Sequence, residues 1–164
     1  MGRLRLNLIA SCKRAPGRCV HFPVKQMNAL DTAKTQGARQ SALALKQVAI
    51  MERRIALAYW QSTFCLQPVG DRFTRKGVVD SLLLGCIPVI FHEQTSRQWP
   101  WHWESWWENA TLMLDLNKSS STEFDVVDVL QQVQTKQIEA IQSVIAARAH
   151  LLQCQLQFCT VKPS

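Results

Sequence analysis

The stretch Ser62–His92, STFCLQPVGDRFTRKGVVDSLLLGCIPVIFH, carries the pattern on which the fold prediction rests. It opens with a short apolar run typical of a strand, and Pro68–Asp71 follows with turn-forming residues. Residues 74–84 then show apolar positions at helical spacing, and Gly85 stands where a helix end favours a left-handed residue. The apolar run 86–91 predicts a second strand that is buried on both faces. A strand, a helix and a parallel strand of these lengths predict one right-handed βαβ unit.

The turn between the first strand and the helix is the expected ligand site, because open α/β sheets bind ligands at the carboxyl ends of their strands. The start of a helix exposes N–H groups and the positive end of the helix dipole, which suits an anion. Gly70 permits a close approach to the backbone, and Thr74 supplies a hydroxyl group. Arg72, Arg75 and Lys76 oppose the helix dipole, so a bound phosphate would explain them better than helix stability does. Solvated side chains are the alternative interpretation.

Several short motifs in this stretch resemble the signature of exostosin-like glycosyltransferases, in particular the plant xyloglucan galactosyltransferase branch and its algal relatives. The motifs are Phe64–Pro68, Gly70-Asp71, Thr74-Arg75, Asp80-Ser81 and Gly85–Val89. They are ordered and correctly spaced over about thirty positions, which makes them far more specific than a single glycine motif.

The resemblance implies an α/β fold with a doubly wound, mostly parallel sheet, the Rossmann-like half of a GT-B glycosyltransferase. It implies inverting transfer of a sugar from a nucleotide diphosphate sugar, expected to be a UDP-sugar, to a glycan acceptor in the lumen of the Golgi. It also implies no metal site and no tightly bound cofactor. A GT-B enzyme has two domains, so a chain of 164 residues is expected to be the donor-binding half. The N-terminal acceptor domain and its general base are then expected to be missing.

Within the chain, we expect residues 1–40 to form an N-terminal helix and loop region, and residues 41–164 to form the donor-binding domain. No apolar run reaches the roughly 20 residues that a membrane helix needs, and charges interrupt Met1–Ala10, which does not fit a signal peptide. Members of the family usually carry an N-terminal membrane anchor. We therefore expect a truncated relative of a Golgi membrane enzyme.

The resemblance also suggests roles for the residues of the turn. Gly70, Asp71, Thr74 and Arg75 are expected to hold the diphosphate. Arg75 is the expected catalytic residue, because its charge would stabilise the departing nucleotide during bond breaking. Helix capping is the alternative role for Asp71, since a carboxylate repels a diphosphate.

Two further carboxylates are expected near the donor. Asp80 offers two acceptor oxygens to the hydroxyl groups of ribose. Its alternative is an i,i+4 ion pair with Lys76 on the helix surface. Glu93 follows the second strand and is a candidate donor-pocket residue, together with His92 and His102.

Five of the six tryptophans fall within residues 99–107. This loop would follow a strand end, so its rings suit stacking on a sugar. An exposed patch that packs on another domain or on a membrane is the equal alternative.

The net charge of +7 is uneven, because residues 1–79 hold 14 Lys or Arg and 3 acids, whereas residues 80–164 hold 5 and 9. A basic half is compatible with nucleic acid, an anionic membrane surface or a phosphorylated ligand. The charges are scattered and no aromatic-basic motif accompanies them, so we expect no nucleic-acid partner. A nucleotide-sugar-binding module without turnover remains the main alternative, and a nucleic-acid-associated domain the lesser one.

Cys12 and Cys19 flank a Pro-Gly turn, where a disulfide is compatible with an oxidising compartment. Cys65 and Cys86 are expected to be buried free thiols in the strands. A chain with all its cysteines reduced is the open alternative.

Outside the central stretch the pattern predicts helices over residues 3–15 and 41–61, a third strand over residues 110–116, a helix starting at Thr122–Asp125 and another from Lys136. Tyr59 and Trp60 are expected to pack against the sheet. Asn109 and Asn117 begin glycosylation sequons, which matter only for a luminal chain.

Overall fold

The computed structural model describes residues 2–22, 42–70, 72–98, 103, 105–121 and 123–153. The helices are α1 (Gly2–Arg14), α3 (Ala42–Gln61), α4 (Lys76–Leu83), α5 (Glu93–Ser96), α7 (Leu116–Ser119), α8 (Val126–Gln131) and α9 (Thr135–Arg148), with the 3-10 helices η2 (Trp107–Asn109) and η3 (Ala149–Leu152). The strands are β1 (Phe64–Gln67), β2 (Ile87–Ile90) and β3 (Leu112–Met113).

The three strands form one parallel sheet in the order β1-β2-β3. Phe64 lies opposite Ile87, and Val89 lies opposite Leu112. The predicted βαβ unit and the mixed α/β class are confirmed. Because the strands are parallel, their carboxyl ends meet at one edge of the sheet, and the turn after β1 lies at that edge.

The end of α4 shows why the chain turns sharply into β2. Gly85 has a φ of 77°, the left-handed conformation that was predicted for it. Its N–H donates to the carbonyl of Leu82 at 3.2 Å, and the N–H of Cys86 donates to the carbonyl of Ser81 at 2.9 Å. These two bonds make a Schellman motif, which satisfies carbonyls that the helix end leaves open.

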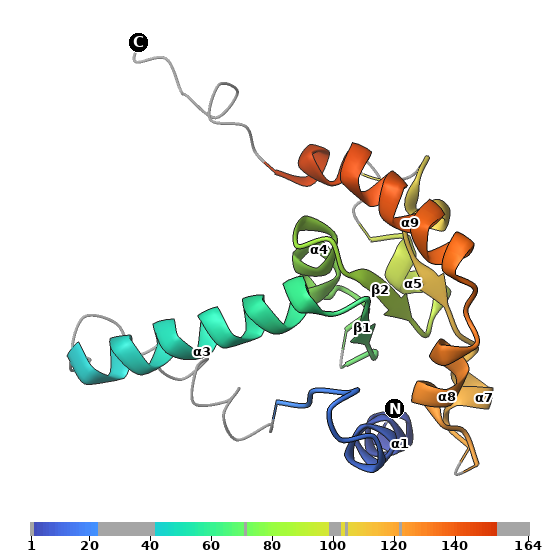
Figure 1. Cartoon of the computed structure of the whole chain (residues 1–164), viewed down its shortest axis with the longest axis horizontal. Coiled ribbons are helices and arrows are strands. Elements are labelled where there is room, and N and C mark those ends of the chain that lie inside the picture. Colours follow the sequence, from blue (N-terminus) through green and yellow to red (C-terminus); the bar gives the residue numbers. More distant parts are fainter. Residues whose placement is uncertain are drawn as a thin grey trace.

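Helices cover both faces of the sheet (Figure 1). One buried cluster joins α4 and α9 to β2 through Val78, Leu82, Ile90, Ile141 and Ile145. The second joins α1 and α8 to the other side of β2 through Leu4, Leu8, Val69, Val89, Phe91 and Val126. Successive residues of a strand point to opposite faces, so a buried strand contributes to both clusters.

The tryptophan loop contributes to the core instead of to a surface. Trp103 and Trp106 are 1% and 7% exposed, and their rings meet edge to face with centroids 6.2 Å apart. Neither the sugar-stacking nor the interface interpretation holds for these two residues, because their ring faces are covered by the cluster between the sheet and α9. Trp99, Trp101 and His102 lie outside the described residues.

The cysteine prediction was half right. Cys12 and Cys19 form a disulfide across the turn after α1. Cys65 and Cys86 are also bridged, with Cα atoms 5.9 Å apart, so the prediction of buried free thiols was wrong. The reason is the register, since pairing of β1 with β2 brings Cys65 beside the start of the neighbouring strand. The two cysteines nearest the C-terminus lie outside the described part of the chain.

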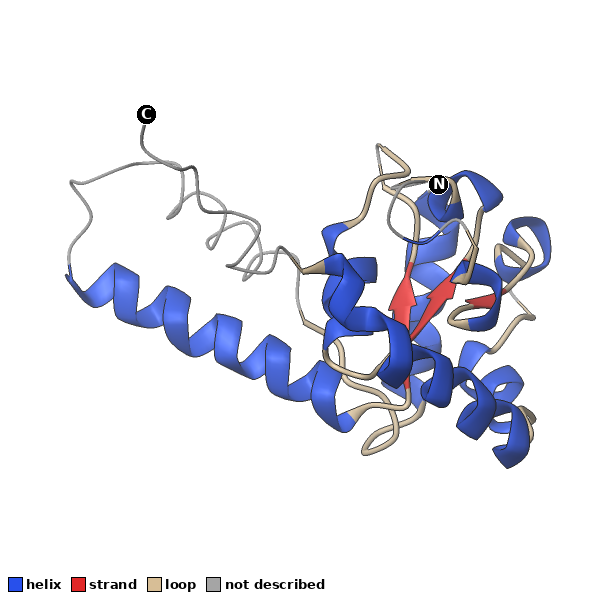
Figure 2. Cartoon of the chain, turned by 90° about the horizontal axis from the view of Figure 1, so that it is seen from above, coloured by secondary structure: helices blue, strands red, loops and turns tan. Residues whose placement is uncertain are grey.

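Helix α3 projects from the rest of the molecule (Figures 1 and 2). The prediction that Trp60 packs against the sheet was wrong, because Trp60 is 68% exposed near the end of this helix. Tyr59 is half-buried, and its hydroxyl accepts a hydrogen bond from Nε2 of Gln67 at 3.3 Å. None of the described helices is long and apolar enough to cross a membrane.

Two element boundaries differ from the prediction because aspartates cap helices. The predicted strand cannot continue to Leu116, because Asp115 is the N-cap of α7 and accepts from the N–H of Lys118. Asp125 does the same for α8 by accepting from Val127, so α8 begins at Val126.

Candidate functional site

Two guanidinium groups converge on Gly70, three residues after the end of β1. A Cβ atom at Gly70 would lie 2.7 Å from Nη1 of Arg75 and 2.9 Å from Nη2 of Arg5. Both distances start from one point, so the two nitrogens are at most about 6 Å apart, where like charges repel by about 1–3 kcal/mol. Among the described residues Arg5 forms no ion pair with a carboxylate. Two guanidinium groups this close together can donate hydrogen bonds to the oxygens of one anion above Gly70.

Helix α1 brings Arg5 to the turn through its apolar face. Leu4, the residue before Arg5, is fully buried in the same cluster as Val69, the residue before Gly70. Burial of these two neighbours therefore fixes the approach of Arg5 to Gly70. Leu8 extends the contact by one helical turn on the same face.

The middle and the C-terminal end of α1 are held by polar contacts. Nη2 of Arg14 pairs with Oδ2 of Asp125 at 2.6 Å, and the side chain of Asn7 donates to the carbonyl of Ser121 at 2.7 Å. Partial burial opposes the charge on Asp125, but hydrogen bonds from Arg14 and from the N–H groups of Val127 and of the residue after it outweigh burial. The pKa of Asp125 is consequently below its usual value of 3.8.

The predicted cations gather at the start of α4. Arg75 occupies the N-cap position, with an extended backbone, and its side chain does not cap the helix. Arg72 and Lys76 are exposed on either side. Because these charges stand at the positive end of the α4 dipole, the region around Gly70 strongly favours an anion.

The loops after β1 and β2 meet at the carboxyl edge of the sheet, as the sequence predicted. The hydroxyl of Thr74 donates to Oε1 of Gln98 at 2.8 Å. The rings of Phe73 and His92 lie 4.6 Å apart, centroid to centroid. His92 is also the N-cap of α5, since its Nδ1 accepts a hydrogen bond from the N–H of Gln94.

The structure places Asp80 on the surface of α4, where Nζ of Lys76 contacts its two oxygens at 2.6 and 2.7 Å. This is the i,i+4 pair that was the alternative to ribose binding. Glu93 is exposed and forms a similar pair with Arg97. Each carboxylate would have to exchange its partner for a ligand, so both assignments stay predictions. Asp71 lies outside the described residues.

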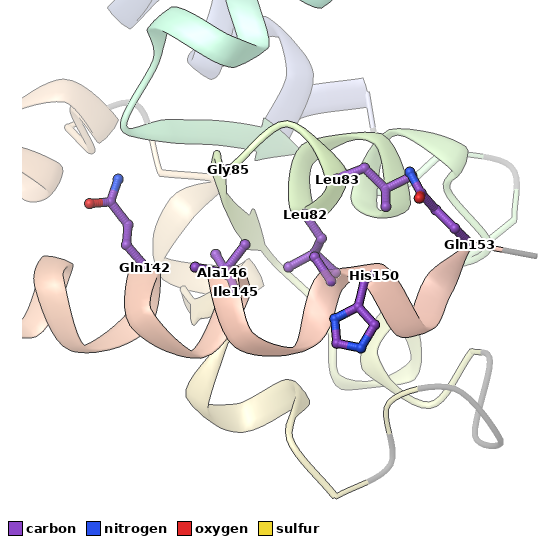
Figure 3. Close-up of a pocket in the computed structure, with 9 residues that line it drawn as sticks. Leu82, Leu83, Gly85, Gln142, Ile145, Ala146, His150 and Gln153 are labelled. Atoms are coloured by element: carbon purple, nitrogen blue, oxygen red, sulfur yellow. The ribbon is translucent and has the colours of Figure 1, made fainter. Parts of the chain in front are cut away.

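A separate hollow lies at the opposite end of α4, between α4, α9 and η3 (Figure 3). It has a volume of about 460 Å³, and Leu82, Ile145 and Ala149 form much of its apolar wall. It is remote from the turn after β1 because it adjoins Gly85, which follows the C-terminal end of α4. We assign no role to it.

Two other expectations concern surface chemistry. Asn109 and Asn117 are exposed, as glycosylation would require, and their modification stays a prediction. Within the described ranges, no group of three or more His, Cys, Asp or Glu residues is arranged to hold a metal ion.

Arg5 is the residue of this site that sequence reasoning missed. It is separated from Gly70 by 65 positions, and no local spacing links the two. The available signal was the basic residue directly after a buried leucine in an amphipathic first helix. That pattern indicates which face a residue flanks, but not which loop it meets.

The sequence of this chain is similar to those of known glycosyltransferases. The Exostosin GT47 domain profile matches residues 2–132, which include α1 and the whole sheet. The chain is 33% identical over 82 residues to the xyloglucan galactosyltransferase MUR3 of Arabidopsis thaliana, covering 49% of this chain and 13% of that protein.

Two other Arabidopsis thaliana proteins show the same pattern. The probable xyloglucan galactosyltransferase GT15 is 60% identical over 42 residues, 25% of this chain and 9% of that protein. The xyloglucan-specific galacturonosyltransferase 1 is 35% identical over 100 residues, 60% of this chain and 12% of that protein. The matched part is therefore roughly a tenth of the length of these relatives.

Proposed function

Because the chain belongs to the Exostosin GT47 domain family, we propose that it forms the donor-binding part of an inverting glycosyltransferase. The donor would be a nucleotide diphosphate sugar, with UDP as the expected nucleotide, and the acceptor a glycan. The observation that carries the proposal is the convergence of guanidinium nitrogen atoms on Gly70 at the carboxyl edge of a parallel sheet. Planar guanidinium groups suit phosphate oxygens, which they can contact in pairs.

In this proposal the sheet is the core of a Rossmann-like, doubly wound half of a GT-B enzyme. Gly70, Asp71 and Thr74 line the diphosphate, and Arg75 neutralises the charge that grows on the nucleotide as the glycosidic bond breaks. Such a contact lowers the barrier because it strengthens in the transition state. The hydroxyl of Thr74 can form a hydrogen bond to the diphosphate once it no longer donates to Gln98.

The general base that removes the acceptor proton is assigned to an acceptor domain outside this chain, in a Golgi-localised enzyme. Asp80 would receive ribose after Lys76 moves away, and Glu93 would join the donor pocket after leaving Arg97. Both exchanges are inexpensive, because exposed ion pairs contribute about 0–1 kcal/mol.

Calorimetric titration of the chain with UDP, UDP-galactose and single-stranded RNA tests the proposal. We expect binding of both uridine nucleotides, and weakening by about 10-fold to 100-fold in Arg75→Gln, since a hydrogen bond to a charged group contributes about 1.5–3 kcal/mol. Arg53→Gln is the matched control, because it removes the same charge from an exposed position on α3. Its affinity should stay within about three-fold of the unsubstituted chain.

Absence of UDP binding would reject a donor site. Binding of RNA without a response to UDP would favour the nucleic-acid alternative. UDP binding combined with no sugar transfer, measured after an acceptor domain is supplied, would favour a nucleotide-sugar-binding module without turnover.

A further inference from the structure

We infer that Arg5 of α1 is a second phosphate-binding residue, and that it makes the site selective for a diphosphate over a monophosphate. The inference rests on the proposed donor site and deepens it. Arg5 lies near the start of the matched region and Arg75 near its middle, yet a guanidinium nitrogen of each lies within 3 Å of the point where a Cβ atom of Gly70 would be. Figure 1 shows α1 beside the sheet, on the face that it shares with α8.

The distances between the cations suit two adjacent phosphate groups. The two guanidinium nitrogens are at most about 6 Å apart, a span over which each can contact a different phosphate of one diphosphate. A monophosphate has oxygens for either group, but a single phosphate offers fewer oxygens to the two groups together than two adjacent phosphates do. Loss of one guanidinium should therefore lower the affinity for a diphosphate more than the affinity for a monophosphate.

The position of Arg5 is fixed by structure that does not depend on a ligand. Leu4 is fully buried beside Val69, and Leu8 adds a second anchor on the same face. Within the part of the chain that the structure describes, the guanidinium forms no ion pair with a carboxylate, and the residue is exposed. Substitution of Arg5 should consequently leave the fold unchanged while it alters the site.

Arg3 provides a control on the same helix. It is also exposed and basic, but it is not among the atoms nearest to Gly70. A general electrostatic attraction of the basic N-terminal helix would make Arg3→Gln and Arg5→Gln equivalent. If Arg5 contacts the ligand directly, only the substitution of Arg5 should lower the affinity for the diphosphate. Arg5→Lys should restore little of that affinity, because lysine lacks the paired donors.

The test is calorimetric titration of the full chain and its variants with UDP, UMP and inorganic pyrophosphate. We expect Arg5→Gln to lower the affinity for UDP and pyrophosphate by about 10-fold or more, and the affinity for UMP by less than about three-fold. Arg3→Gln should leave the affinity for all three ligands unchanged. Thermal melts of each variant should coincide with that of the unsubstituted chain.

The outcomes separate the two proposals. If the unsubstituted chain binds neither UDP nor pyrophosphate, the donor site itself is rejected, and Arg5 with it. If the chain binds UDP and Arg75→Gln weakens it, while Arg5→Gln behaves like Arg3→Gln, the donor site stands and the role of Arg5 is rejected. Equal weakening of UDP and UMP by Arg5→Gln would overturn the diphosphate selectivity.

Discussion

Gly70→Ala is the substitution that most directly tests the geometry of the site. The added Cβ would lie 2.7 Å from Nη1 of Arg75 and 2.9 Å from Nη2 of Arg5. Carbon and nitrogen atoms in ordinary contact are about 3.5–4 Å apart, so each guanidinium must move by roughly 1 Å. Gly70 is not one of the glycines with positive φ, so alanine fits its backbone conformation.

The expected effect is a loss of ligand affinity without a loss of stability. The displaced groups are the ends of long flexible side chains, which can swing away, and alanine at a compatible position gains about 0.4–1 kcal/mol by restricting the unfolded chain. The unfolding free energy should therefore change by less than about 1 kcal/mol, and the melting temperature by less than about 5 °C. The affinity for UDP should fall about 10-fold or more, because both charge-assisted contacts are displaced.

Denaturant unfolding measures the first quantity and calorimetric titration with UDP the second. Gly2→Ala is the control, since an added Cβ there meets no atom of the described residues within 4 Å. A Gly70→Ala variant that binds UDP like the Gly2→Ala variant would refute the placement of the ligand above Gly70. A loss of several kcal/mol of stability would instead show that the two arginines are rigid parts of the core.

Four further outcomes are expected. Gly77→Ala should destabilise the chain by about 1–2 kcal/mol in denaturant unfolding, because the added Cβ would lie 2.5 Å from Oε1 of Gln67. Gln67 is 5% exposed, and its Nε2 donates to Ser81, Tyr59 and the Gly77 carbonyl. The clash and the loss of these hydrogen bonds outweigh the roughly 1 kcal/mol by which alanine stabilises a helix relative to glycine. A stability equal to that of the unsubstituted chain would contradict this network. Cys65→Ser with Cys86→Ser should remove about 3 kcal/mol, as expected for a disulfide that closes a loop of this length, and a melt insensitive to both the substitutions and a reductant would argue against the bridge. The lowered pKa of Asp125 contributes stability that is present well above pH 3.8 and is lost as the pH falls through the pKa of the folded state. In Asp125→Asn the free energy of unfolding should therefore fall less steeply between neutral and acidic pH, and an unchanged pH dependence would exclude this contribution. Trp60→Gln should change the unfolding free energy by less than about 0.5 kcal/mol, because the residue is exposed, whereas a larger loss would place the ring in a core.

The local parts of the fold could be predicted from the sequence because their causes are local. Gly85 ends α4 through its own backbone conformation, and the change from helical to continuous apolar spacing marks the start of β2. The same holds for α3, where twenty residues without proline or glycine form a helix despite sparse packing.

The errors concern contacts that only the tertiary structure decides. Trp103 and Trp106 looked like a surface cluster because they share a loop with other tryptophans, yet the loop folds them under α9. Cys65 and Cys86 met because of strand register, which the apolar runs alone do not specify. Arg5 belongs to the same class, since its approach to Gly70 depends on how α1 packs on the sheet.

That packing also explains how two like charges can be held together in the free protein. The repulsion between Arg5 and Arg75 amounts to at most a few kcal/mol, whereas burial of Leu4 and Val69 side chains contributes about 1.5–3 kcal/mol each. The core that stabilises the sheet therefore also sets the positions of the charges before a ligand arrives. Because the side chains of such a site are already in position, ligand binding costs little free energy for ordering them. More of the interaction energy is then available to bind the diphosphate and to stabilise the charge on the departing nucleotide.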